Sequence, residues 1–212
     1  MDKTTLLVLL AALSPAQEQS AQKGEDTEGI EVQKAYLIPI EKAWTDENGD
    51  THIEGWISKP GPDLERDAVE PEAFKGAMDE YFALGAPLTT QHQMLPTPER
   101  GVFTRYPVGH IQKAAIVRDG QILASAVHPT DPADFQHFPG NGTGVYGRAT
   151  LTDPTAAIQV AKGNVRGFSW VGRALAKPLP GGRHEFVEIL HWRESTIAAF
   201  PIHPGANIVA AS

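Results

Sequence analysis

The 212-residue sequence contains no cysteine, which excludes disulfide bridges, thiolate metal sites and cysteine nucleophiles. Positive charge is also scarce. The chain has 18 Lys and Arg residues against 26 Asp and Glu residues, for a formal net charge of −8. A general nucleic-acid-binding protein needs a basic face, so the composition disfavours that class of function, and we expect no nucleic acid among the partners.

Long apolar runs are missing as well. The run at residues 6–13 is much shorter than the roughly 20 residues of a membrane-spanning helix, so we expect no membrane insertion. This run is either a short secretory signal or a tail that binds a partner. Residues 17–29 are rich in Gln, Glu, Ser and Gly, as is typical of a flexible linker. We therefore expect an N-terminal apolar segment and linker over residues 1–29, and a folded domain over residues 30–212.

Glycine and proline are plentiful, with 20 and 17 residues, and the apolar runs between them are short. This pattern predicts a strand-rich, loop-rich domain. Asp119-Gly120 lies between two alternating runs and predicts a hairpin, as does the turn at residues 46–50. A further turn is expected at residues 178–182. The expected strands cover residues 32–44, 53–57, 86–92, 107–117, 121–127, 145–151, 165–175 and 185–200.

Two helices are expected. The first begins at Pro71, where a missing N–H matters least, and ends before Gly85. The second follows Asp153 as its N-cap and ends at Gly163. One face of the first helix is apolar and consists of Phe74, Ala77, Met78, Tyr81 and Phe82.

Ser169 lies between two aromatic residues in the strand expected over residues 165–175. Side chains alternate between the two faces of a strand, so Phe168 and Trp170 point together into the core and Ser169 points away, outward or into a cleft. Gly172 allows another backbone or a peptide to approach closely. Taken alone, Ser169 is most simply a solvent-facing serine.

His92 ends the short strand expected over residues 86–92. A neutral imidazole accepts a proton near pH 7, as a serine nucleophile requires of its neighbour. A third group must then orient the imidazole, and the strand over residues 185–200 offers Glu194, His191 and His184. Alternation places Glu194 on the face of Trp192 and Thr196 and His191 on the opposite face, which leaves the choice open.

A metal site is a competing hypothesis. His128, Asp131, Asp134 and His137 are metal-ligand types at three-residue intervals. Pro129 and Pro132 break any helix that would align them, so a turn-rich loop is the better interpretation and no metal or other cofactor is expected.

Several motifs, in order, resemble the prohead (head maturation) serine proteases of tailed bacteriophages, which are related to the herpesvirus assemblin proteases. The resemblance covers residues 53–209, about three-quarters of the chain. Gln91-His92 resembles the family's Gln-His, and residues 163–169 resemble its Gly-x-x-x-Gly-x-Ser segment. The other matching segments are Glu54-Gly55-Trp56, residues 67–74, Pro107-Val108-Gly109, Glu194-Ser195-Thr196 and residues 200–206.

The resemblance implies Ser169 as nucleophile, His92 as general base and Glu194 as the third member of a triad. It implies an α+β, β-rich fold, a closed or nearly closed antiparallel β-barrel flanked by a few helices. It also implies an endopeptidase that acts inside the prohead, in the host cytoplasm, on the scaffold protein, the N-terminal region of the major capsid protein and itself, as a monomer or a homo-oligomer. The chain departs from the family pattern at Gln93, where an acidic residue is usual, and at Trp170, where a small aliphatic residue is common.

Two other hypotheses remain open at this stage. The first is a catalytically silent capsid-assembly protein that keeps the same fold and binds capsid or scaffold. The second is a secreted binding or metal-dependent domain, for which residues 6–13 would be a true signal.

Overall fold

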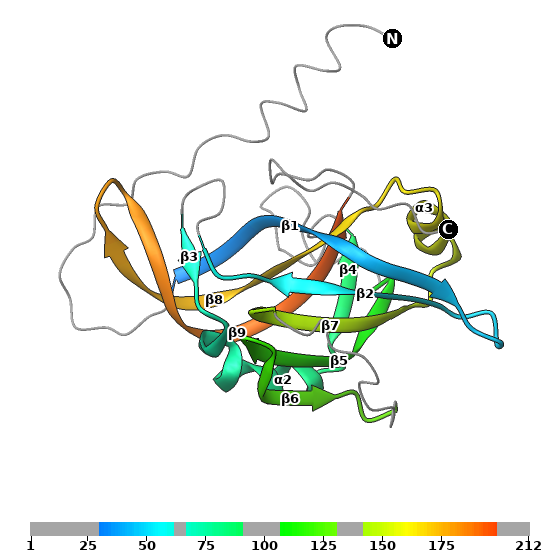
Figure 1. Ribbon diagram of the computed structural model, residues 1–212, viewed down its shortest axis with the longest axis horizontal. Helices are drawn as coiled ribbons and strands as arrows, with labels where there is room; N and C mark the ends of the chain where they lie inside the picture. Colours follow the sequence, from blue (N-terminus) through cyan, green and yellow to red (C-terminus); the bar gives the residue numbers. More distant parts are fainter. Residues whose placement is uncertain (1–29, 62–66, 91–106, 131–141, 199–212) are drawn as a thin grey trace, which may run out of the picture.

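The computed structural model of the protein describes residues 30–61, 67–90, 107–130 and 142–198. These residues form nine strands and two helical segments, shown in Figure 1. The helical segments are η1 (Pro71–Phe74) running directly into α2 (Lys75–Ala83), and α3 (Pro154–Ala161). The strands are β1 (Ile30–Thr45), β2 (Thr51–Ser58), β3 (Ala68–Val69), β4 (Pro87–Thr90), β5 (Gly109–Arg118), β6 (Gln121–Val127), β7 (Gly144–Leu151), β8 (Gly167–Leu179) and β9 (Arg183–Ala198).

All nine strands belong to one curled sheet of order β3-β9-β4-β5-β7-β2-β1-β8, with β6 paired to β5 and a further pairing between β9 and β8. The expected β-rich fold with helices beside the sheet is confirmed. The expectation that the closed or nearly closed barrel is antiparallel throughout is wrong, because β3 and β4 both run parallel to β9 and the sheet is therefore mixed. The sheet curls around the core (Figure 1), and the last strand of this order, β8, pairs back to β9. The ladder that joins β4 to β5 has only the pairs Pro87–His110 and Leu88–Gly109.

Both predicted hairpins form. In the β1–β2 turn the Asp46 carboxylate accepts the backbone N–H groups of Asn48 and Asp50, each at 2.9 Å. In the β5–β6 turn Asp119 and Gly120 have φ values of +50° and +78°. A two-residue hairpin loop of type I′ needs positive φ at both positions, and Asp-Gly adopts this conformation at low cost.

Both predicted helices form as well. The residues expected on the apolar face of the first helix are all buried, and Gly85 follows it with φ +88°. Asp153 caps α3, since its Oδ1 accepts the N–H of Ala156 at 2.8 Å, and Gly163 follows with φ +67°. Within the described part of the chain, no helix has the length and apolar character that a membrane span requires.

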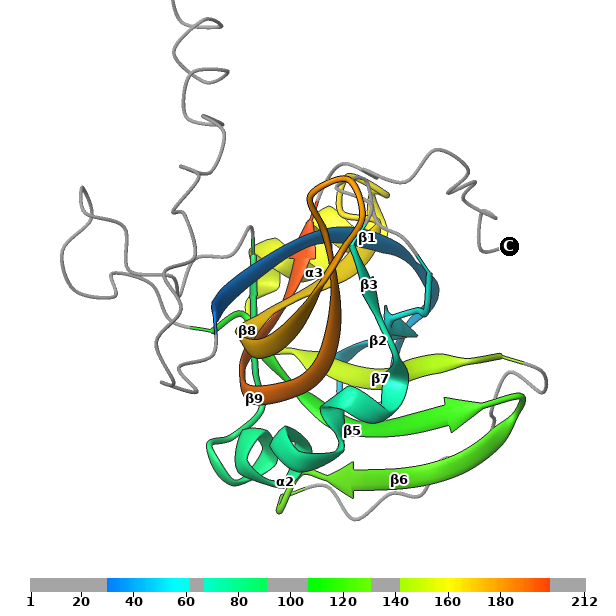
Figure 2. The same cartoon turned by 90° about the vertical axis from the view of Figure 1, so that its left-hand side faces the viewer.

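The helix α2 packs its buried face against β9 through aromatic rings, and it lies beside β6 at the outer end of the sheet (Figure 2). Tyr81 stacks on Trp192 with ring centroids 4.2 Å apart, and Phe74 meets both Trp170 (4.8 Å) and Trp192 (5.2 Å) edge to face. Such aromatic pairs contribute about 0.5–1.5 kcal/mol beyond their burial. This aromatic cluster fixes β8 and β9 relative to α2.

The strand β8 is longer than predicted. It continues through Pro178 to Leu179, where a turn was expected, and the turn begins only at Pro180. The reason is local: the pairing of β8 with β1 ends at Ala174, so beyond it the described ladder is with β9 alone. Pro178 therefore sits on an edge, where its missing N–H is tolerated.

Candidate active site

Ser169 lies on β8 and pairs directly with Thr196 on β9. Its neighbours Phe168 and Trp170 are both 0% exposed and belong to the core, as the alternation predicted. Ser169 points to the other face, yet it is only 2% exposed. The interpretation as a solvent-facing serine is therefore wrong.

A row of three hydroxyl side chains crosses the sheet at Ser169. Thr196 pairs with Ser169 on one side and with Thr89 of β4 on the other. Residues paired directly across a sheet share a face, so the three side chains point the same way. All three are buried, with exposures of 2% or less. A row of three buried hydroxyls is unusual, because burying a polar group costs free energy unless the group is hydrogen-bonded.

Glu194 joins this face. It pairs with Val171, two residues along β8 from Ser169, or roughly 7 Å at about 3.3 Å per residue. Its carboxylate is 1% exposed, and the Thr89 hydroxyl donates to Oε2 at 3.0 Å. The structure therefore brings two of the three predicted site residues, Ser169 and Glu194, to one buried face.

A β-bulge decides which way Glu194 points. Val171 pairs with Glu194 but the next residue, Gly172, pairs with Trp192, so Arg193 is an extra residue in β9. The bulge breaks the alternation. Trp192 turns to the core face, where it stacks on Tyr81, while Glu194 turns to the face of Ser169. The expectation that Glu194 and Trp192 share a face is therefore wrong, although Glu194 does share one with Thr196.

The two alternative third members lie elsewhere. His191 pairs with Arg173, its side chain is half exposed, and its Nδ1 is 3.1 Å from Oε2 of Glu80 on α2. His184 pairs with Pro178, nine residues along β8 from Ser169, which is roughly 30 Å. Its Nδ1 lies 3.5 Å from Oδ1 of Asp67. Neither histidine is placed beside Ser169.

His92 lies outside the described residues. The described chain stops at Thr90, the end of β4, two residues before it. Because β4 runs parallel to β9, its last residue, Thr90, pairs with Ile197, one residue beyond Thr196. The assignment of His92 as general base therefore stays a prediction.

Three of the four candidate metal ligands, Asp131, Asp134 and His137, also lie outside the described residues. His128 is described, and its Nδ1 lies 2.7 Å from the Thr130 hydroxyl. In the four described ranges, no group of three or more His, Asp or Glu side chains could hold a metal ion.

The ladder between β1 and β8 is interrupted at Ser169. Lys34 pairs with Trp170 and Ile38 pairs with Phe168. Between these pairs, β1 has residues 35–37 where β8 has only Ser169. Elsewhere in this ladder the pairing runs one residue to one. The register between β1 and β8 is therefore irregular at the candidate nucleophile.

A buried tyrosine supports the site from the core side, and the sequence analysis missed this role. The Tyr81 hydroxyl donates to the carbonyl oxygen of Pro87 at 2.8 Å and accepts the N–H of Ser195 at 3.2 Å. It also shares a hydrogen bond of 3.0 Å with the Ser195 hydroxyl. Burial raises the pKa of the Tyr81 phenol far above its usual range, so the hydroxyl stays protonated. Tyr81 thus joins α2 to β4 and β9, and no local sequence signal marks contacts 114 residues apart.

The structure resembles a phage capsid protease. It is similar to a solved structure of the bacteriophage T4 capsid assembly protease, gp21, with a TM-score of 0.45 and 12% sequence identity, over 82% of this chain and 96% of that chain. An identity of 12% assigns no role to any residue of this chain. No protein-family model matches the sequence, and no curated protein matches it.

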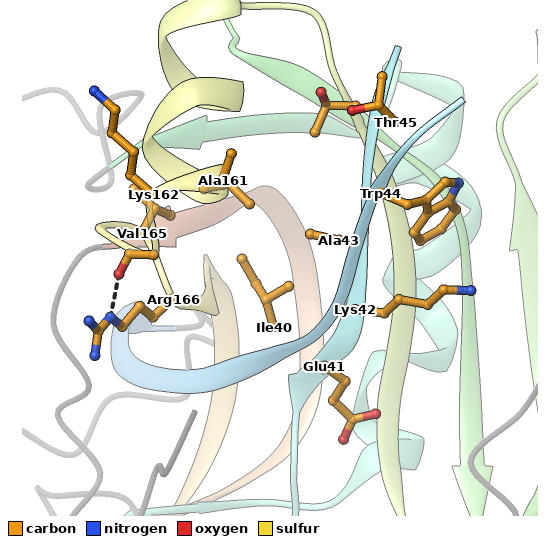
Figure 3. Close-up of a pocket in the computed structure, with 13 residues that line it drawn as sticks. Ile40, Glu41, Lys42, Ala43, Trp44, Thr45, Ala161, Lys162, Val165 and Arg166 are labelled. Carbon is orange, nitrogen blue, oxygen red and sulfur yellow. Dashed lines mark hydrogen bonds between the residues drawn. The ribbon is translucent and has the colours of Figure 1, made fainter. Parts of the chain in front are cut away.

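A separate cavity of about 570 Å³ lies between the β1–β2 hairpin and the connection from α3 to β8. In Figure 3, Ile40 and Ala43 of β1 face Ala161 and Val165, while the charged ends of Lys162 and Arg166 extend at the rim. Neither Ser169, Thr89 nor Glu194 lines it. The cavity is apolar with a basic rim and is distinct from the buried face described above.

Proposed function

We propose that this protein is a serine endopeptidase of the phage prohead, with Ser169 as nucleophile, His92 as general base and Glu194 as the group that orients His92. The observation that carries the proposal is the buried face on which Ser169 and Glu194 lie two residues apart along the β8–β9 ladder. The strand next to them, β4, ends two residues before His92. The family resemblance supplies the roles, and this arrangement supports them.

In the proposed reaction, Ser169 Oγ attacks the carbonyl carbon of a peptide bond while His92 accepts the hydroxyl proton. The tetrahedral intermediate collapses, the C–N bond breaks, and His92 passes its proton to the leaving amine. Water then attacks the acyl-enzyme ester while His92 accepts a proton from it. The ester C–O bond breaks, His92 returns the proton to Ser169 Oγ, and the acid product is released. The Glu194 carboxylate holds the imidazole in the reactive tautomer and stabilises its charged form.

The proposed substrates are the scaffold protein, the N-terminal region of the major capsid protein and the protease itself, inside the prohead in the host cytoplasm. Residues 30–212 are the proposed protease domain. Residues 1–29 are the proposed propeptide, with self-cleavage in the linker at residues 17–29 and anchoring through residues 6–13. No cofactor takes part in this chemistry.

The test is labelling of the purified protein with a fluorophosphonate, together with co-expression with the capsid protein of the same phage. Ser169→Ala should abolish both the label and the cleavage products. Ser58→Ala is the matched control, since Ser58 is a strand serine with 1% exposure on β2, and it should leave both unchanged.

Cleavage products that persist unchanged in Ser169→Ala would refute the nucleophile assignment. A wild-type protein that takes no label but still enters proheads would instead indicate a catalytically silent assembly protein.

A further inference from the structure

We propose that Thr89 is a positioning residue of this site, which holds the Glu194 carboxylate and ties the strand leading to His92 to the strand carrying Glu194. The inference rests on the proposed function. It starts from one short contact: the Thr89 hydroxyl donates to Glu194 Oε2 at 3.0 Å, with both residues at most 1% exposed.

The hydroxyl has a single proton and two acceptors within reach. The second acceptor is the backbone carbonyl of Ser195, at 3.5 Å. The Glu194 oxygen is the nearer acceptor, at 3.0 Å against 3.5 Å, and hydrogen bonds weaken with distance. The proton of Thr89 therefore goes to Glu194.

A second bond fixes Thr89 from the other direction. The Thr196 hydroxyl donates to the backbone carbonyl of Thr89 at 3.2 Å. Thr196 stands between Thr89 and Ser169 in the row across the sheet. One residue of β4 is thus bonded through its side chain to Glu194 and through its backbone to the partner of Ser169.

These bonds matter because β4 is short. It has four residues, with three pairs to β9 (Leu88–Ser195, Thr89–Thr196 and Thr90–Ile197) and two pairs to β5. Few ladder bonds hold such a strand, so side-chain bonds contribute a large share of its fixation. Any shift of β4 along β9 would move the Thr89 hydroxyl relative to the Glu194 carboxylate that it contacts.

A threonine suits this task because of its shape. Its β-branched side chain has restricted χ1 rotation on a strand, so the hydroxyl is held toward its acceptor. Valine has nearly the same shape and no hydroxyl, and serine keeps the hydroxyl but lacks the methyl group. The two substitutions therefore separate the hydrogen bond from the packing.

The experiment measures fluorophosphonate labelling of the full chain, with the maximal labelling rate kinact and the half-saturation concentration KI determined separately. Thr89→Val should lower kinact by on the order of tenfold, less than the ~10²-fold that a 1 Å misplacement of a catalytic group can cost, and leave KI unchanged. Thr89→Ser should recover most of the rate. Thr150→Val is the matched control, since it removes a buried hydroxyl bonded to His52 Nδ1 at 3.1 Å on β7 and should leave kinact unchanged.

A purely structural role would lower the labelled fraction and the unfolding temperature of Thr89→Val without changing kinact of the folded fraction, and that result would overturn the proposal. So would a loss in Thr89→Ser as large as in Thr89→Val. In a Glu194→Gln background, Thr89→Val should have little further effect, whereas two independent losses that multiply would show that Thr89 does not act through Glu194.

A wild-type chain that is not labelled at all would contradict the proposed function itself. In that case urea unfolding of the same two single variants and the double variant still tests the contact: additive losses would refute it, and coupled losses would leave it standing without a catalytic role.

Discussion

Gly172 of β8 lies directly against the backbone carbonyl of His191 on β9, so closely that a Cβ at position 172 would stand 2.3 Å from that oxygen. This contact occurs at the bulge where Arg193 is the extra residue and where Glu194 turns to the face of Ser169. The absence of a side chain at Gly172 is therefore part of the geometry of the candidate site.

Replacing Gly172 by alanine should destabilise the fold by about 1–3 kcal/mol, the usual cost of forcing extra volume into a packed region. It should also lower fluorophosphonate labelling, since β9 must shift where it carries Glu194. Gly76→Ala on α2 is the control, because nothing lies within 4 Å of a Cβ there and alanine favours a helix by about 1 kcal/mol over glycine. Urea unfolding measures both variants. Equal effects of the two substitutions would contradict the role given to the bulge.

Tyr81→Phe should destabilise the protein by about 1–3 kcal/mol, because the carbonyl of Pro87 and the N–H of Ser195 lose a buried partner. The ring and its stacking on Trp192 are kept, so the loss reports the hydroxyl alone. The measurement is urea unfolding followed by tryptophan fluorescence. A variant as stable as the wild type would show that water replaces the hydroxyl.

Arg148→Met should be strongly destabilising. Arg148 on β7 forms an ion pair with Glu54 on β2, and the two side chains are 17% and 5% exposed. Removing one partner leaves a buried charge unpaired, which costs about 3–5 kcal/mol. The double variant Glu54→Leu with Arg148→Met should recover much of this stability, as measured by thermal unfolding. If the double variant is less stable than Arg148→Met alone, the ion pair is not the cause of the loss.

Asp46→Asn should reduce the acid sensitivity of the fold. A hydrogen bond with His52 Nε2, and then the N–H groups of Asp50 and Asn48, hold the pKa of the Asp46 carboxyl below its ordinary value of 3.8. The folded carboxyl is therefore harder to protonate than the unfolded one, so its contribution is present above about pH 3.8 and is lost as the pH falls through the folded pKa.

The measurement for Asp46 is the unfolding temperature as a function of pH below 4, where the Asp46→Asn curve should be flatter than that of the wild type. The matched control is Asp79→Asn on the exposed side of α2, which should keep the wild-type slope. Parallel curves for the wild type and Asp46→Asn would refute the prediction.

Much of the local structure follows from short-range chemistry that a sequence displays. Asp153 and Gly163 bound α3, and Asp119-Gly120 forms the β5–β6 turn, because each of these conformations depends on the residues themselves. The burial of Phe168 and Trp170 follows from strand alternation. The sequence predicts a turn at Pro178, but Pro178 lies in β8. A strand tolerates proline only where no neighbouring strand needs its N–H, and the sequence alone does not show where the pairing with β1 ends.

The motifs around Ser169 and Glu194 identified two candidate residues. Alternation along the strand, however, wrongly placed Glu194 on the same face as Trp192. The bulge at Arg193 depends on the pairing of β8 with β9, so alternation counted along one strand cannot find it. Thr89 and Tyr81 were missed for the same reason. Their partners, Glu194 and Ser195, are 105 and 114 residues away in the chain.

The sequence by itself determined most of the elements, the core face of β8 and the candidate residues Ser169, His92 and Glu194, because propensity, alternation and motif order are local properties. Only the tertiary structure decided that the sheet is mixed, that Ser169 is buried and not exposed to solvent, and that Glu194 lies on its face with Thr89 as donor. The physical reason is that these features arise from pairing between strands distant in the chain, where one extra residue in β9 puts Trp192 and Glu194 on opposite faces.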